Sequence, residues 1–301
     1  MQEYLANWLI QRYQRAISQK PDDPKAWSKL YTICTQESRS GEFVQFCEET
    51  IRHHAGNHHA WTFLQLSAGD DAHSIDLLSF SKEIVRLHAD DEHAWHHLDA
   101  AYEKCEDDSD FIDFCTEIAR QQPNNPSALI RLTQAYKKQG KYTELISTCF
   151  QLLTAMPGDA QTWCNLADAY AARCKYDDAI AAYEKAIVLK PNFVVAWNNL
   201  GNVYHLQAQY DDAVRAYQKA ISIDPGDATP WVWLCLAYAE MGKPLEARAA
   251  VEKVEKRLPL VASMLNEELA EKFSTLAASS TSTHLASHET DSRVSVGRST
   301  H

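Results

Sequence analysis

Apolar and small residues recur along this chain in two groups per 34 residues. One period contains Trp163, Leu166, Ala167 and Tyr170, then Tyr176, Ala179, Tyr183 and Ala186, and finally Pro191. Spacings of three and four residues place each group on one face of a helix. The pattern therefore predicts two amphipathic helices in every period, with a proline-marked turn after the second.

Tryptophan marks the period most clearly. Six tryptophans are separated by 34 residues or a multiple of 34: Trp27, Trp61, Trp95, Trp163, Trp197 and Trp231. Leu129 stands at the missing mark, and a leucine follows each mark by three residues, at Leu30, Leu64, Leu98, Leu132, Leu166, Leu200 and Leu234. A fixed period of this length indicates stacked repeats. The sequence thus predicts an all-α solenoid.

The residue before each repeat defines the boundaries. Counting the tryptophan as position 4, the repeats begin at residues 24, 58, 92, 126, 160, 194 and 228, and together they span residues 24–261. The preceding residues are Asp23, Asn57, Asp91, Asn125, Asp159, Phe193 and Asp227. All but Phe193 are strong N-cap residues. The helix after Phe193 is therefore predicted to begin without a side-chain cap.

Both ends of the chain continue or close the pattern. Residues 1–23 are predicted to form an N-terminal half-repeat that caps the first full repeat. Residues 262–276 are predicted to form a C-terminal capping helix, since apolar residues recur every four positions, at Val261, Leu265, Leu269 and Phe273. Residues 277–301 are rich in Ser and Thr and lack apolar periodicity, so a disordered tail is predicted there.

Small residues mark the expected close approach of the paired helices, namely Ala167 with Ala179 and Gly201 with Ala213. In the first three repeats, Phe43, Leu77 and Phe111 replace the small residue of the second helix. We therefore expect the helix pairs of those repeats to be spaced differently.

These residues resemble the tetratricopeptide repeat (TPR) family, whose signature is Trp, Leu, Gly or Ala, Tyr, Ala, Phe or Tyr, Ala and Pro at these spacings. The resemblance covers about residues 24–261. It implies a right-handed α-solenoid of about seven helix–turn–helix repeats with a capping helix at each end. It also implies a concave face lined by the first helix of each repeat, and a role as a protein–protein interaction scaffold.

Candidate binding residues follow from the positions that line this face in the family. Asn165, Asn198, Asn199 and Asn202 form a local polar group, and side-chain amides can both donate to and accept from a peptide backbone. The other candidates on the same face are Lys29, Phe63, Arg131, Gln134 and Trp233. Trp233 suits either a binding hot spot or packing beneath the C-terminal cap. The partner is expected to be an extended peptide or a helix of another protein. The alternative interpretation is that these asparagines are only solvated residues on a helix face.

Two further functions stay open. The asparagine group is similar to the repeat region of protein O-GlcNAc transferases, which implies a regulatory or substrate-recruiting subunit of a separate enzyme. The second is self-assembly, in which the concave face of one copy of the chain binds the N-terminal helix or the tail of another copy. The carboxylate clamp of some family members is not expected, because Lys29 and Arg131 are isolated cations in the sequence.

Histidines gather between residues 53 and 97, where His59, His93 and His97 share helix faces one turn or one period apart. Three imidazoles could hold a metal, but no fourth ligand is placed with them by spacing. We therefore predict no metal site and no cofactor. Seven acidic residues between Glu103 and Glu117 lack the glycine of a calcium loop and are interpreted as a solvated turn.

Composition narrows the class of partner and compartment. The net charge of −12 argues against nucleic acid or an anionic membrane as the main partner. The eight cysteines form no Cys-x-x-Cys pair, and they are interpreted as buried reduced thiols. There is no signal-peptide pattern or run of membrane-spanning length, so a cytoplasmic protein is predicted. No catalytic motif is present, and the protein is not expected to be an enzyme.

Overall fold

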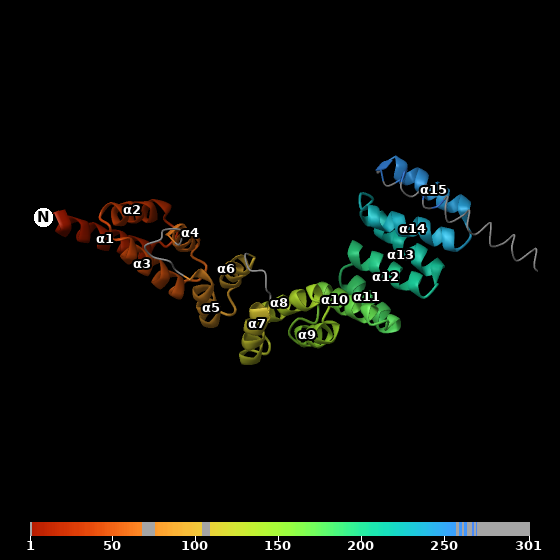
Figure 1. Cartoon of the computed structure of the whole chain (residues 1–301), viewed down its shortest axis with the longest axis horizontal. Helices are drawn as coiled ribbons and strands as arrows, with labels where there is room; N and C mark the ends of the chain where they lie inside the picture. The colour runs from red at the N-terminus through yellow and green to blue at the C-terminus, as the bar shows by residue number, and fades with distance from the viewer. Residues whose placement is uncertain are drawn as a thin grey trace, which may run out of the picture. The chain divides into compact units, whose positions relative to one another are not determined.

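A computed structural model describes residues 2–67, 76–103 and 109–256, together with residues 259, 260, 262, 263, 267 and 269. These residues form helices and no strand (Figure 1). The fifteen helices are α1 Gln2–Gln19, α2 Pro24–Gln36, α3 Ser40–His53, α4 His58–Ser67, α5 Leu77–Leu87, α6 Glu92–Tyr102, α7 Ser109–Gln121, α8 Pro126–Lys138, α9 Tyr142–Ala155, α10 Ala160–Ala172, α11 Tyr176–Leu189, α12 Val194–Leu206, α13 Tyr210–Ile223, α14 Ala228–Glu240 and α15 Pro244–Glu255. The predicted all-α fold is confirmed.

The chain divides into two compact units. The N-terminal unit comprises residues 1–140 and 150–155, and the C-terminal unit comprises residues 141–149 and 156–301. Helices α1–α8 belong to the first and α10–α15 to the second, while α9 contributes to both. The two units are described separately below.

The even-numbered helices from α2 to α14 begin at the seven residues where the period places a repeat start. Side chains before them accept hydrogen bonds from the first turn, as Asn125 does from the Ala128 amide at 3.1 Å and Asp159 from the Thr162 amide at 2.9 Å. Phe193 makes no such bond before α12. The prediction of an uncapped start at this helix is therefore confirmed.

The period-marking tryptophans all make the same hydrogen bond. Each indole Nε1 donates to the backbone carbonyl six residues earlier: Trp27 to Pro21, Trp61 to Ala55, Trp95 to Ala89, Trp163 to Pro157, Trp197 to Pro191 and Trp231 to Pro225, at 2.7–3.3 Å. The Nδ2 atoms of Asn57 and Asn125 donate to two of these carbonyls, those of Pro21 and Ala89, at 3.2 and 2.9 Å. At these two places the turn before a repeat is tied both to that repeat and to the turn that precedes the next one.

In the N-terminal unit the three period-marking tryptophans are buried, and each lies beside a phenylalanine of the following helix. Trp61 lies 5.6 Å from Phe80 of α5, and Trp95 lies 6.2 Å from Phe114 of α7, measured between ring centroids. Trp27, Trp61 and Trp95 are at most 1% exposed. Burial of rings of this size is the largest single source of apolar stabilisation in such a repeat.

Ion pairs run along the second helices of the same unit. The Arg52 guanidinium of α3 donates to Glu83 of α5 at 2.7 Å, and Arg86 of α5 donates to Glu117 of α7 at 3.0 Å. The two pairs are one period apart, and each arginine also lies over a phenylalanine ring of the next repeat. We call these two pairs the arginine ladder.

The C-terminal unit packs around small residues instead. Gly201 of α12 faces the ring of Tyr217 of α13, and a Cβ added at Gly201 would lie 2.5 Å from the Tyr217 Cε1 atom. Ala167, Ala179 and Ala213 are fully buried. The predicted close approach of paired helices is confirmed, with the tyrosine ring as the neighbour that requires glycine.

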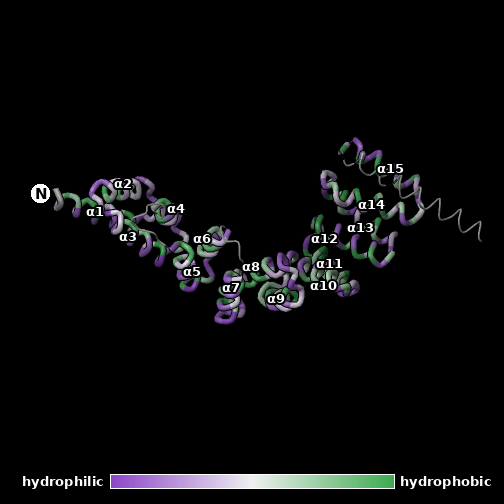
Figure 2. The backbone as a smooth tube through the Cα atoms, viewed as in Figure 1, coloured by the Kyte–Doolittle hydropathy of each residue, from purple (hydrophilic) through white to green (hydrophobic). Residues whose placement is uncertain are grey.

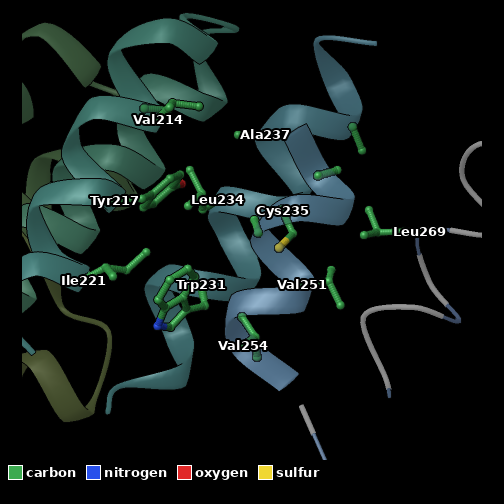
Figure 3. Close-up of a cluster of buried hydrophobic side chains, with 14 of the residues drawn as sticks. Val214, Tyr217, Ile221, Trp231, Leu234, Cys235, Ala237, Val251, Val254 and Leu269 are labelled. Atoms are coloured by element: carbon green, nitrogen blue, oxygen red, sulfur yellow. The ribbon is translucent and has the colours of Figure 1, made fainter. Parts of the chain in front are cut away.

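A continuous apolar cluster fills the end of this unit (Figure 3). Tyr217 and Ile221 of α13 face Trp231 and Leu234 of α14, and Val251 of α15 lies on the far side of α14. Leu269 is 5% exposed and belongs to the cluster. Val261, Leu265 and Phe273 of the predicted cap, and the predicted tail at residues 277–301, lie outside the described residues.

Hydrophobic and hydrophilic residues alternate within the helices throughout (Figure 2). The buried apolar residues lie on the faces where neighbouring helices pack. Among the residues that the structure describes, no helix is long and apolar enough to cross a membrane.

Candidate functional site

A hydrogen-bonded group in the C-terminal unit joins two consecutive repeats. The Tyr183 hydroxyl of α11 donates to Oδ1 of Asp168 on α10. Nδ2 of Asn199 on α12 donates to the same oxygen at 3.0 Å. The carboxylate of Asp168 thus holds the Asn199 side chain at a fixed place on the surface formed by α10, α12 and α14, which we call the first-helix face.

Half of this arrangement recurs in the next repeat. The Tyr217 hydroxyl of α13 donates to Oδ1 of Asn202 on α12 at 2.9 Å, as Tyr183 does to Asp168. The position that corresponds to Asn199 is held by Trp233, and no hydrogen bond joins Trp233 to Asn202 among the described residues. The Nδ2 group of Asn202 donates to no other described residue, and it stays available as a donor.

Asn198 is the unusual member of the group. Its side chain is 8% exposed, and its Nδ2 donates to Oδ1 of Asn199 at 3.4 Å. Its Oδ1 is buried and has no hydrogen-bond partner among the described residues. Leaving a buried acceptor unsatisfied costs about 1–3 kcal/mol. A donor supplied by a ligand would remove that cost once the Asn198 side chain turns toward the first-helix face, because Oδ1 has almost no accessible surface in the structure as it stands.

Asn165 and Trp233 flank these residues. Oδ1 of Asn165 accepts from Nε2 of Gln161 at 3.2 Å, and the Asn165 side chain is 8% exposed. Trp233 is half-buried, lies 5.8 Å from the His205 ring, and packs against the apolar cluster shown in Figure 3. Trp233 therefore packs on the cluster while part of its side chain stays accessible, and its role in binding stays a prediction.

Burial controls the protonation of the two tyrosines. It raises the pKa of Tyr183, and the neighbouring Asp168 raises it further. Burial likewise raises the pKa of Tyr217. Both hydroxyls therefore remain donors at physiological pH. Asp168, Tyr183 and Tyr217 were not among the predicted site residues, although the period places each tyrosine opposite position 9 of its own repeat.

The remaining candidates lie in the N-terminal unit. Arg131 of α8 is not the isolated cation expected from sequence: it donates to Asp99 at 2.6 Å and to Glu92 at 2.9 Å, and its guanidinium lies 4.8 Å from the Trp95 ring. Burial alone would lower the pKa of Arg131, and the hydrogen bonds to the two acids more than offset it. The acids lie one period earlier, a pairing that no short-range pattern reveals.

Phe63 of α4 also has neighbours within the fold. Its ring lies 6.1 Å from Trp27, 5.2 Å from Tyr31 and 5.5 Å from Phe43. Lys29 is exposed, with its ammonium 5.9 Å from the Tyr13 ring, and Gln134 is exposed as well. Phe63 and Arg131 thus have packing roles, while Lys29 and Gln134 are accessible.

Two of the three candidate metal-binding histidines, His93 and His97, pack within the fold. No group of three or more potential ligands that includes His59, His93 and His97 occurs among the described residues. The His97 ring instead stacks on Trp61 with centroids 4.0 Å apart, and burial, followed by the neighbouring histidines, lowers the pKa of His97 to about 4. His93 packs on Gly56, 3.1 Å from the position of a Cβ there.

The acidic segment is incompletely described, because residues 104–108 lie outside the described ranges. Asp110 accepts from Lys82 at 2.6 Å and from Tyr102 at 2.5 Å, and these bonds lower its pKa. Glu117 belongs to the arginine ladder, where the bond from Arg86 lowers the pKa of that carboxyl. These two acids stabilise contacts between repeats.

Family comparisons match the repeats directly. Two models described as tetratricopeptide repeat match residues 128–161 and 194–227, and one described as TPR repeat matches residues 167–208. The chain therefore contains tetratricopeptide repeats. The matches include all of α12, which carries Asn198, Asn199 and Asn202, and the two ends of α10. No curated protein matches the chain significantly in sequence.

Solved TPR structures resemble portions of the chain. The match to YrrB, described as a TPR protein with an unusual peptide-binding site, covers 62% of this chain and 97% of the YrrB chain, with 14% identity and a TM-score of 0.50. MamA covers 53% and 89%, with 27% identity and a TM-score of 0.47. The first TPR of Spaghetti (RPAP3) bound to the HSP90 peptide SRMEEVD covers 39% and 93%, with 21% identity and a TM-score of 0.38. The YrrB likeness supports the shared TPR fold.

Proposed function

We propose that this TPR protein is a non-catalytic interaction scaffold whose C-terminal unit binds an extended peptide on the first-helix face. The observation that carries the proposal is the buried, unpartnered Oδ1 of Asn198. A peptide N–H is the natural donor for it, because an extended backbone offers one amide and one carbonyl at every residue.

The neighbouring amides complete a site of mixed polarity. Asn202 offers its Nδ2 to a peptide carbonyl, while its Oδ1 is held by Tyr217. Asn199 is oriented by Asp168, so its side chain needs little further ordering when a ligand binds. Contacts of this kind read the backbone and tolerate different side chains. The half-buried Trp233 beside them would add an apolar anchor.

Membership of the TPR family supports this role in general terms, and YrrB is itself described as having a peptide-binding site. We infer no catalytic step, since the residues of the site are amides, one hydrogen-bonded carboxylate and protonated tyrosines. Recruitment of substrates to a separate enzyme would use the same surface. The cytoplasmic location stays a prediction from the sequence.

Selection of peptides tests the proposal. Random twelve-residue peptides displayed on phage would be selected on the full chain and then titrated by calorimetry. Asn198→Ala and Asn202→Ala should each weaken binding about tenfold, or about 1.4 kcal/mol. Asn192→Ala, at an exposed turn residue, is the matched control and should leave the affinity unchanged. Failure to select any binder, or selected peptides that bind both variants as well as the wild type, would remove the basis of the proposal.

A second candidate function is self-assembly through α1. Tyr4, Leu5 and Trp8 are 80%, 56% and 51% exposed on this helix, a concentration of apolar surface that marks interaction sites. Light scattering over a concentration series should then show a mass that rises with concentration and that falls to the monomer value in a Leu5→Ser, Trp8→Ser variant. A constant monomer mass in the wild type would exclude it.

A further inference from the structure

Two pockets in the C-terminal unit are the same site repeated one period apart. The larger, of about 620 Å³, is lined by Trp197, Leu200 and Tyr204 of α12 together with residues of α11 and α13. The smaller, of about 380 Å³, is lined by Trp231, Leu234 and Tyr238 of α14 together with residues of α13 and α15. Every residue that lines the smaller pocket lies 34 positions after one that lines the larger.

The pockets exist because of one column of the repeat. Ala216 lines the first pocket and Ala250 lines the second, each on the second helix of its repeat. The N-terminal unit has Phe80 and Phe114 in this column, and their rings pack on the tryptophans there. A methyl group cannot fill the space of a phenyl ring, so the tryptophan face becomes the wall of an open pocket.

Charged residues recur at two positions of both pockets, and Glu184 and Arg215 line the larger pocket in addition. Asp212 and Glu246 stand near the start of α13 and α15, and Lys219 and Lys253 stand seven residues later. Asp212 also pairs with Arg215 on its own helix. At the repeat position of these two lysines, the N-terminal unit has acidic residues, Glu83 and Glu117. The C-terminal unit therefore presents an acidic row and a basic row on either side of two apolar pockets, a surface we call the second-helix face.

The dimensions of this surface fit a helix. Seven residues of α13 or α15 span about 10 Å between the two rows, close to the diameter of a helix with its side chains and about twice the width of a single extended strand. Neighbouring packed helices lie about 8–10 Å apart. Apolar side chains at positions i and i+7 of a partner helix are about 10 Å apart, and so they can enter the two pockets together.

We propose that the second-helix face binds an amphipathic helix of a partner protein, with apolar residues at i and i+7, basic residues along the edge that meets Asp212 and Glu246, and acidic residues along the edge that meets Lys219 and Lys253. This surface is built from residues other than those of the first-helix face. The scaffold can therefore hold two ligands of different chemistry.

A designed peptide is the probe. It is a fluorescein-labelled, helix-stabilised peptide of 18 residues with leucines at i and i+7, lysines along one edge and glutamates along the other, titrated into the full chain by anisotropy. Ala216→Phe and Ala250→Phe restore the side chain of the N-terminal repeats and should each weaken binding at least tenfold. Leu245→Ala, which changes an exposed residue outside both pockets, is the control and should have no effect. A peptide with leucines at i and i+5 should bind at least tenfold more weakly.

Charge reversal tests the same surface without altering the pockets. Lys219→Glu with Lys253→Glu should abolish binding of the peptide, and a peptide whose glutamate edge is changed to lysine should regain it. Asn198→Ala should bind the probe like the wild type, which separates this site from the peptide site on the first-helix face.

The proposal is overturned if the designed peptide does not bind, if it binds the Phe variants and the wild type equally, or if reversal of both charges fails to restore affinity. Concentration-dependent dimers that Ala216→Phe disrupts would identify a second copy of the chain as the occupant and would equally overturn it.

Discussion

The N-terminal unit places phenylalanine beside the tryptophan of each repeat, whereas the C-terminal unit places alanine there. The first choice buries Trp61 and Trp95 completely. The second leaves Trp197 half-buried over a pocket of about 620 Å³, and Trp231, which is 5% exposed, lines a smaller pocket of about 380 Å³. The indole makes the same hydrogen bond to a carbonyl in both units. The tryptophan thus fixes the turn in the six repeats that contain it, while a different column, phenylalanine or alanine, determines whether a pocket opens beside the ring.

Tryptophan truncation is the strongest way to test this contrast. Trp61→Ala should cost about 3–5 kcal/mol, because a fully buried ring stacked on His97 and packed on Phe80 is lost. Trp197→Ala should cost at least about 1 kcal/mol less, since one side of the ring already faces solvent. Urea unfolding of each variant, followed by circular dichroism, provides the measurement. Equal losses would mean that exposure of the ring does not control its contribution.

Adding one methyl group at Gly201 tests the close packing of the C-terminal unit. Alanine is favoured over glycine in a helix by about 1 kcal/mol, but its Cβ would lie 2.5 Å from Tyr217. We expect Gly201→Ala to lose about 1–3 kcal/mol despite that preference. Gly158→Ala is the control, because no atom lies within 4 Å of the added Cβ and the melting temperature should hardly change. A Gly201→Ala variant more stable than the wild type would show that α12 and α13 can accommodate the added methyl group.

Acidification should weaken the N-terminal unit through His97. Its pKa in the folded chain, about 4, is below the value of about 6.5 in the unfolded chain, so folded His97 resists protonation. The associated stability is complete above pH 6.5 and is lost as the pH falls toward 4, amounting to about 1–2 kcal/mol between pH 7.5 and 5. Hydrogen exchange in α4 and α6 measures this change. His97→Phe keeps a ring on Trp61 and should lose this component of the pH dependence; an unchanged profile in that variant would contradict the assignment.

The arginine ladder should have the smallest effect. Arg86 is 46% exposed and Glu117 is 35% exposed, so their pair should contribute at most about 1 kcal/mol. A double-mutant cycle with Arg86→Met and Glu117→Gln, measured at low salt and at high salt of about 1 M, isolates the coupling, which should shrink as salt is added. A coupling above about 2 kcal/mol would require a desolvated pair, contrary to the exposure.

Periodicity was sufficient to predict the fold. The 34-residue spacing of the tryptophans and the capping residues located the start of the first helix in each repeat, because a helix and its cap depend on residues close together in the sequence. Contacts between repeats were harder to predict. Arg131 appeared isolated in sequence, yet its acidic partners lie 32 and 39 residues earlier. Pairings at about one period become visible only when the columns of successive repeats are read against each other.

The asparagines of the candidate site were named from the sequence, and their role in binding stays a prediction. Asn198, Asn199 and Asn202 were identified, but which amide is satisfied by Asp168 or Tyr217 depends on side-chain geometry across helices. The paired pockets were missed for a related reason. They arise where alanine stands in place of phenylalanine in one column, and whether the space left by the smaller side chain stays open depends on how the neighbouring helices pack.

The carbonyl that accepts the hydrogen bond of each tryptophan determines where a single repeat can be excised from such a chain. Trp27 bonds to Pro21, and the same Pro21 carbonyl accepts from Asn57 of the following repeat, so the turn before the first helix belongs to the module as much as the helix does. A segment excised at residue 24 would lose the acceptor for its own indole, whereas one excised at residue 21 would carry it along. The repeat unit of this protein is therefore expected to begin three residues ahead of the helix. Arrays assembled from segments that begin at residue 21 should have a higher melting temperature than arrays assembled from segments that begin at residue 24.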